Sequence, residues 1–221
     1  MKKIKLLSSA LLLAVSLTAQ AQDMVLHDPM TSRVFSSEKY SDVKGTPYWF
    51  DKWIQGSVTI EKGTYKDLPI KYDVYENLLY FSLADASYIF ADPVLHFVLK
   101  PNPADSSSYL NFIKGITGNG LKADQYVQVI AQGKLSIFRS DIKQVAELNE
   151  INKGVIKSFS TVTRYYAKKD KTVSLIKLNK QELTDLMQDK NEAIQKYISD
   201  NKISFKKEAD AAKLIAYYNS L

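Results

Sequence analysis

The feature that most constrains the fold of this chain is a change in the spacing of its apolar residues near Leu178. Before Leu178, apolar side chains recur at every second position in short runs with turn residues between them, which is typical of strands that bury one face. After it they recur every three or four positions, as on one face of a helix. Strands first and helices last predict an α+β chain, with an antiparallel β-sheet body over 45–178 and a C-terminal cap of about three short helices over 179–221.

The alternation is clearest from residue 54, where one face carries Ile54, Gly56, Val58 and Ile60 and the other is polar. Lys62-Gly63 follows and supplies the positive-φ residue of a tight hairpin, and the alternation returns from Leu68 to Val74. Pro69 lies opposite the apolar face of the return strand, so its missing N–H confines it to an edge or a bulge.

The remaining body is expected to consist of short strands separated by turn residues. These strands are predicted at Leu78–Ser82, Tyr88–Ala91, Val94–Leu99, Tyr126–Ala131 and Leu135–Phe138. Asp141–Asn152 is predicted to be a short helix. A long final hairpin is predicted from two strands, Ile156–Ala167 and Thr172–Leu178. The charged run Lys168–Lys171 between them would form its solvated tip.

Two helix starts are predicted by N-cap spacing, Asn179 with Glu182 and Asp189 with Glu192, because the second carboxylate of each pair can reach back to the cap. The apolar stripes of these two helices are Leu183, Leu186 and Met187, then Ile194, Tyr197 and Ile198. A third helix is predicted from about Lys206 to the end, with its stripe at Ala211, Leu214, Ile215, Tyr218 and Leu221.

The first 21 residues have the pattern of a cleaved signal peptide. Lys2, Lys3 and Lys5 precede an apolar stretch over 6–17, and Ala19-Gln20-Ala21 has the small-x-small cleavage pattern. The apolar stretch is about a dozen residues, short of the roughly 20 needed to cross a bilayer. We therefore expect an exported chain that starts at Gln22, soluble in the periplasm or outside the cell, with an irregular lead-in over 22–44 and no transmembrane segment.

Composition and charge exclude several classes of function. The chain has no cysteine and two histidines, which excludes a disulfide scaffold, a thiolate nucleophile and a cysteine- or histidine-rich metal site, and no cofactor is expected. The formal charge is +6, from 30 basic and 24 acidic side chains, and half of it belongs to the leader. The rest lies after residue 166, so the body is neutral and lacks the basic footprint that nucleic acid requires.

No catalytic motif is present in the sequence. The glycine cluster over 115–120 lacks the Lys-Ser/Thr that follows a phosphate loop and is interpreted as a turn. His96 lies in an apolar run and is interpreted as a histidine satisfied by a neighbour, although a Ser–His–Asp unit with Asp92 stays open. His27 is expected at the surface. The catalytic residues are therefore unknown, and no metal ligands are predicted.

The candidate ligand-binding residues are aromatic. Tyr48, Trp49 and Trp53, with Phe50 between them, precede the first clear strand, and such rings can stack on sugars or hold an apolar partner. The alternative is that they fill the core, since large aromatic residues commonly do so in β-proteins.

Two blocks of the chain carry a resemblance. The first is Gly45-Thr46-Pro47-Tyr48, Trp53, Gly56, Lys62-Gly63, Leu68-Pro69-Ile70 and Tyr72, and the second is Leu178-Asn179-Lys180, Asp189-Lys190, Tyr197-Ile198, Phe205–Glu208 and Tyr217–Leu221. The chain resembles a group of uncharacterised exported (periplasmic) bacterial proteins with no assigned function. It has Gln188 where similar proteins often carry a proline. The resemblance implies export to the cell envelope and transfers no catalytic residue or ligand.

The sequence thus predicts a non-catalytic soluble cell-envelope protein that acts by binding or scaffolding, with an envelope protein, a glycan or a lipid as partner. Two alternatives stay open. One is an exported hydrolase that uses Ser/Asp/His chemistry, and the other is a periplasmic carrier of a lipid or peptide in the concave face of a curved sheet.

Overall fold

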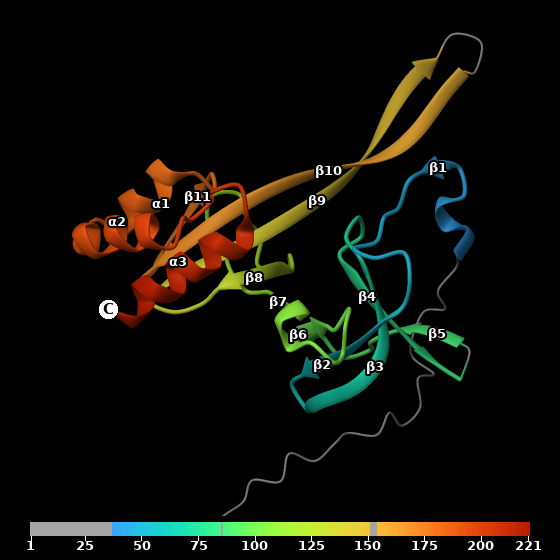
Figure 1. Ribbon diagram of the computed structural model, residues 1–221. Helices are drawn as coiled ribbons and strands as arrows, with labels where there is room; N and C mark the ends of the chain where they lie inside the picture. The colour runs from blue at the N-terminus through green and yellow to red at the C-terminus, as the bar shows by residue number, and fades with distance from the viewer. Residues whose placement is uncertain (1–36, 85, 151–153) are drawn as a thin grey trace, which may run out of the picture.

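The structure, a computed structural model, describes residues 37–84, 86–150 and 154–221. The described residues form an 11-stranded sheet followed by three α-helices, so the α+β prediction is confirmed (Figure 1). The strand order is β1-β10-β9-β8-β7-β6-β2-β3-β4-β5, and β11 also pairs with β10. Neighbouring strands are antiparallel except for β1 and β10, which are parallel.

The strands are β1 Val43–Lys44, β2 Ile54–Ile60, β3 Gly63–Asp73, β4 Leu78–Leu83, β5 Ala86–Ile89, β6 Val94–Leu99, β7 Leu110–Ile113, β8 Val127–Ala131, β9 Leu135–Glu150, β10 Gly154–Lys169 and β11 Thr172–Ile176. Short 3-10 turns lie at η1 Ser37–Tyr40, η2 Ser106–Ser108 and η3 Gln188–Lys190. The leader and residues 22–36 of the expected lead-in lie outside the described residues, while residues 37–44 contain η1 and β1. The prediction omits β1 and β7.

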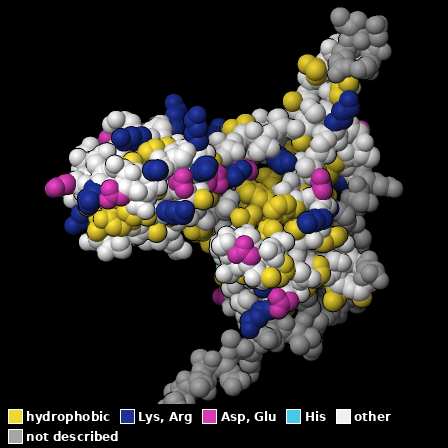
Figure 2. Space-filling view, viewed as in Figure 1, with side chains coloured by type: hydrophobic (Ala, Val, Ile, Leu, Met, Phe, Trp, Pro, Cys, Tyr) yellow, Lys and Arg dark blue, Asp and Glu magenta, His cyan; other side chains and the backbone are white. Residues whose placement is uncertain are grey.

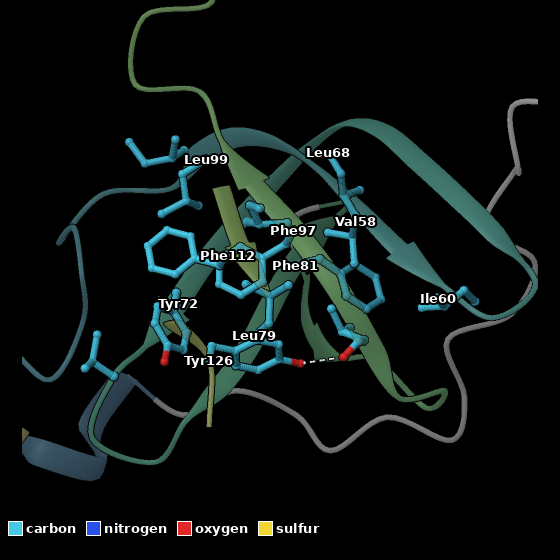
Figure 3. Close-up of a cluster of buried hydrophobic side chains, with 14 residues drawn as sticks. Val58, Ile60, Leu68, Tyr72, Leu79, Phe81, Phe97, Leu99, Phe112 and Tyr126 are labelled. Atoms are coloured by element: carbon cyan, nitrogen blue, oxygen red, sulfur yellow. Dashed lines mark hydrogen bonds between the residues drawn. The ribbon is translucent and has the colours of Figure 1, made fainter. Parts of the chain in front are cut away.

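The core of the β2–β7 region consists of aromatic and aliphatic side chains on the inner face of the sheet, and Figure 3 shows them packed together. The rings of Phe97 and Phe112 stack with centroids 4.7 Å apart, and the Tyr126 hydroxyl donates a hydrogen bond of 2.9 Å to the Val94 carbonyl. The alternation predicted for β2 is confirmed, because the side chains at positions 54, 58 and 60 are buried. Side chains fill this face of the sheet.

The glycine on the core face of β2 has a steric reason. A Cβ atom at Gly56 would lie 2.4 Å from the carbonyl oxygen of Val98 and 2.4 Å from Cδ1 of Ile70. β2 lies between β3 and β6, so a larger residue would push against both neighbours at once. Pro69 pairs with Gln55 of β2 and lies outside the part of β3 that pairs with β4, which agrees with its predicted edge position.

β9 and β10 form a hairpin of two 16-residue strands, and its far half extends away from the rest of the molecule (Figure 1). The helix predicted over Asp141–Asn152 is therefore wrong for residues 141–150, because β9 continues through them. Residues 151 and 152 lie outside the described chain. Every residue from 141 to 150 pairs with β10, for example Val145 with Phe159. Inter-strand pairing outweighs the local helix propensity of the Ala, Glu and Leu residues here.

The helical cap, residues 180–220, consists of α1 Lys180–Leu186, α2 Asn191–Asp200 and α3 Glu208–Ser220. The predicted stripes pack against β9 and β10, and Leu186, Tyr197 and Ile198 of these stripes are only partly buried. The fully buried cluster contains Leu135, Ile137, Ala167, Leu183, Met187, Ile194, Leu214, Ile215 and Tyr218. Leu221 belongs to the predicted stripe but is exposed. Among the described residues, none of the helices has the length and apolar character needed to span a membrane.

One predicted helix cap is confirmed and the other is wrong. The Asn179 side chain accepts a 2.9 Å hydrogen bond from the backbone N–H of Glu182, at the start of α1. Asp189 does not cap α2. Its carboxylate accepts hydrogen bonds from Lys169 Nζ at 3.0 Å and from the Tyr218 hydroxyl at 2.9 Å, and so ties the end of β10 to α3. The turn at Lys168–Lys171 is thus anchored through Lys169.

Candidate functional site

The structure places the predicted aromatic residues at the edge of the core. Tyr48 is 9% exposed, and Nζ of Lys71 lies 4.2 Å from its ring centroid. Trp49 is half-buried and packs edge-on against Phe112, with centroids 4.9 Å apart. Trp53 is also half-buried, with Lys71 Nζ 5.8 Å from its ring. Two of these three residues thus contribute to packing, and their role in ligand binding stays a prediction.

The structure gives the candidate hydrolase residues other partners. His96 is half-buried in β6, where burial lowers the pKa of its imidazole and a hydrogen bond to the Asn111 side chain partly opposes that effect. The Asp92 carboxylate is bound by Lys62 Nζ at 3.1 Å to both oxygens. His27 lies outside the described residues. Within residues 37–84, 86–150 and 154–221 no group of three His, Asp or Glu side chains could hold a metal ion.

A polar network joins the hairpin, the helical cap and the aromatic loop. Arg139 of β9 donates to both oxygens of Asp141, at 2.9 and 2.7 Å, and to Oε1 of Glu208 at the start of α3, at 3.1 Å. The Tyr165 hydroxyl donates to the same oxygen of Glu208. The guanidinium carbon of Arg139 lies 5.1 Å from the ring centroid of Trp49. A single side chain therefore contacts all three parts of the fold.

Strand alternation explains why these groups meet. Residues 139 and 141 point to the same face of β9, and their partners on β10 are Tyr165 and Thr163. Burial opposes the charge of Arg139, but the hydrogen bond and the charges of Asp141 and Glu208 raise the pKa of its guanidinium overall. Burial, together with the bond to Glu208, raises the pKa of Tyr165 to about 12. The network thus places one guanidinium between two carboxyl groups.

A groove on the described surface opens beside this network, at the point where β11 ends and the chain turns toward α1. Its volume is about 740 Å³. The groove is lined by Thr163, Arg164 and Tyr165 of β10, by Leu175–Leu178, by Glu182 of α1, and by Phe205, Lys206 and Glu208 before and at the start of α3. We call this set of residues the groove.

The two carboxylates of the groove are already hydrogen-bonded, and its cations are not paired. Glu208 is held by the Arg139 network, and Glu182 accepts a 2.8 Å bond from the backbone N–H of Lys177. In the described part of the chain, the side chains of Arg164, Lys177 and Lys206 form no ion pair. Apolar surface lies beside them, from Leu175, Leu178 and Phe205. The groove therefore offers apolar contact together with three cations that pair with no described carboxylate, and with Glu182 and Glu208 its formal charge is one positive.

An open strand edge leads into the groove. β10 pairs with β1 at residues 157–158 and with β11 at 165–169, while Phe159–Arg164 pair with β9 alone among the described residues. The side chains from Ser160 to Arg164 are all exposed. We call Phe159–Arg164 the β10 edge. Its backbone donors and acceptors are a template for another strand.

Figure 2 shows hydrophobic side chains gathered between the helices and the β2–β5 part of the sheet, with charged side chains of both signs around them.

The sequence indicated the strand over 156–167, which contains the β10 edge, but no local pattern shows which of the two sides of this strand lacks a neighbour.

The comparisons with known proteins add no relative: no family model, no curated protein and no solved structure matches the chain.

Proposed function

We propose that this protein is a non-catalytic binding protein of the cell envelope, and that it holds a ligand with an apolar part and an anionic group in the groove. The observation that carries the proposal is a groove of about 740 Å³ in which Arg164, Lys177 and Lys206, which pair with no described carboxylate, lie beside apolar surface. That volume lies within the usual range for small-molecule sites. The expected signal peptide supports a place in the envelope.

The geometry gives less support to the other two functions expected from the sequence. A hydrolase needs a nucleophile, a base and an orienting group within hydrogen-bond reach. The described candidates are engaged elsewhere, Asp92 with Lys62 and His96 with Asn111. A carrier that uses the concave face of the sheet needs a cavity there, and aromatic side chains such as Phe97 and Phe112 fill it (Figure 3).

A titration with 8-anilinonaphthalene-1-sulfonate tests the proposal, because this fluorescent probe combines apolar rings with one anionic group. We expect saturable binding by the folded mature chain. The double variant Arg164→Gln/Lys206→Gln should bind at least tenfold more weakly, since the loss of even one hydrogen bond to a charged group costs about 1.5 kcal/mol.

The matched control is Lys52→Gln/Lys122→Gln, which also removes two exposed cations but lies outside the groove. The control should bind the probe as the unchanged protein does. Equal affinity in both double variants, or no saturable binding at all, would contradict the proposed site. Ester, peptide and glycoside substrates test the hydrolase alternative, and we expect no turnover with or without His96→Ala.

A further inference from the structure

The β10 edge is closed at both ends, and this limits what can occupy it. β1 takes the positions before Phe159 and β11 takes those after Arg164. At about 3.3 Å per residue, the stretch that pairs with β9 alone among the described strands is roughly 20 Å long and accepts about six extended residues. An occupant must therefore be a short segment that enters and leaves between two strands already in place.

The same limit argues against a second copy of β10 as the occupant. A two-fold pair of β10 edges would continue past residue 164 of one copy into residue 158 of the other. Those positions already pair with β11 and β1 in each copy. The β10 strands of two copies would collide with these neighbours, whereas a linear segment with a free end would not.

The charge of the groove sets the direction of the segment. The groove lies at the Arg164 end of the β10 edge, and its unpaired cations are suited to a carboxylate. A chain whose last residue enters the groove runs in the direction of β10, from Phe159 toward Arg164. That direction is parallel to β10, and β1 already pairs with β10 in this way.

We propose that the β10 edge and the groove together bind the C-terminal segment of a partner polypeptide. About six extended residues add to β10 as a parallel strand, and the terminal carboxylate lies among Arg164, Lys177 and Lys206. An apolar last side chain contacts Leu178 and Phe205 in the groove. This inference rests on the proposed function and names the ligand class for the same groove.

The neighbouring residues of β10 support this mode of recognition. From Ser160 to Thr163 the edge has no charged side chain and is rich in β-branched residues, so main-chain hydrogen bonds would supply most of the affinity along it. Specificity would come from the carboxylate and the last side chain. An incoming chain would also cover the open edge, which a protein otherwise has to protect from unwanted pairing.

The test uses fluorescein-labelled Thr-Thr-Val-Thr-Val-Leu with a free carboxylate and the mature chain, with binding followed by fluorescence anisotropy. The C-terminal amide of the same peptide should bind at least tenfold more weakly. Two further peptides carry backbone N-methyl groups on the odd or on the even residues. Because alternate N–H groups of a strand face its neighbour, one N-methyl set should lose at least tenfold and the other should stay within threefold.

Variants and hydrogen exchange locate the binding site. Arg164→Gln/Lys206→Gln should weaken the free acid and leave the amide unchanged, while Lys52→Gln/Lys122→Gln should change neither. Hydrogen exchange should slow at Phe159–Arg164 when the free acid is added.

Four outcomes would overturn the inference. Equal binding of the acid and the amide would show that the terminal carboxylate does not contribute to binding. Equal loss of affinity with both N-methyl sets would show that the peptide does not pair with β10 as a strand. Self-association of the chain that Thr161→Lys abolishes would assign the β10 edge to a second copy. If the groove binds the sulfonate probe but not the peptide, the proposed function stands and the peptide inference is wrong. If neither the probe nor the peptide binds, both proposals are wrong.

Discussion

Replacing Arg139 with methionine should destabilise the protein by about 3 kcal/mol. Methionine keeps an apolar stem against Trp49 but removes the two bonds to Asp141 and the bond to Glu208. The Asp141 side chain is 8% exposed, so it cannot recover its lost partners from bulk water. Removing one partner of a largely buried charge pair usually costs 3–5 kcal/mol, and the 27% exposure of Arg139 places this case near the lower end.

Urea unfolding followed by far-UV circular dichroism measures this loss. With a slope of about 3 kcal/mol per molar urea for a chain of this size, the midpoint should fall by about 1 M. Arg164→Met is the matched control, because this exposed arginine on β10 forms no ion pair with a described residue. Its free energy of unfolding should change by less than about 0.5 kcal/mol.

A second substitution tests the physical cause. If the cost comes from an unpaired carboxylate, adding Asp141→Leu to Arg139→Met should restore at least about 1 kcal/mol, since an apolar pair replaces a broken ionic pair. The reasoning is refuted if Arg139→Met unfolds at the same urea concentration as Arg164→Met. No recovery in the double variant would instead assign the loss to side-chain packing.

Three other perturbations have defined outcomes. Gly56→Ala should lower the free energy of unfolding by about 3 kcal/mol, because the added Cβ would lie 2.4 Å from both a backbone atom and a side-chain atom. Gly120→Ala should cost only about 1 kcal/mol, because its Cβ would have nothing within 4 Å and the cost comes from a φ of +85°. The reverse order in urea unfolding would contradict the packing described for β2. Trp49→Ala should lower stability by about 3 kcal/mol, and an unchanged melting temperature would remove this residue from the core. The bond from Lys169, then that from Tyr218, lowers the pKa of Asp189 to about 2. The contribution of Asp189 to stability should therefore be complete above about pH 4 and be lost as the pH falls toward 2. Urea unfolding at several pH values measures this contribution as the difference in stability between the unchanged protein and Asp189→Asn. That difference should shrink between about pH 4 and pH 2.

Local patterns in the sequence predicted most elements of the fold. Alternation located β2 and β3, helical spacing located the buried face of α3, and the N-cap spacing of Asn179 gave the start of α1. The prediction failed where partners distant in sequence decide the structure. The second half of β9 has helix-forming residues but is held by β10, and Asp189 serves Lys169 and Tyr218 rather than its own helix.

The candidate site was less predictable than the fold. The aromatic residues singled out by type include Trp49, which packs beneath Arg139 at the border of the network. The groove itself depends on where β11 stops and on which side of β10 lacks a strand. Both depend on how distant elements are placed, so neither property belongs to any short stretch of sequence. Arg164 and Lys206, which form no ion pair with a described residue, become a site only when residues 42 positions apart are brought together.

The parallel pairing of β1 with β10 has a consequence for the order of folding. Asp42 and Lys157, 115 residues apart in the chain, form an ion pair of 3.1 Å beside this pairing. Strands such as β3 and β4 instead pair across a few residues, as Asp73 does with Leu78. Closing the longer loop costs roughly 3 kcal/mol more in chain entropy, since that cost grows with the logarithm of loop length. β1 can therefore pair only after nearly the whole sheet has been synthesised. The meander β2–β5 can form long before β1 pairs with β10.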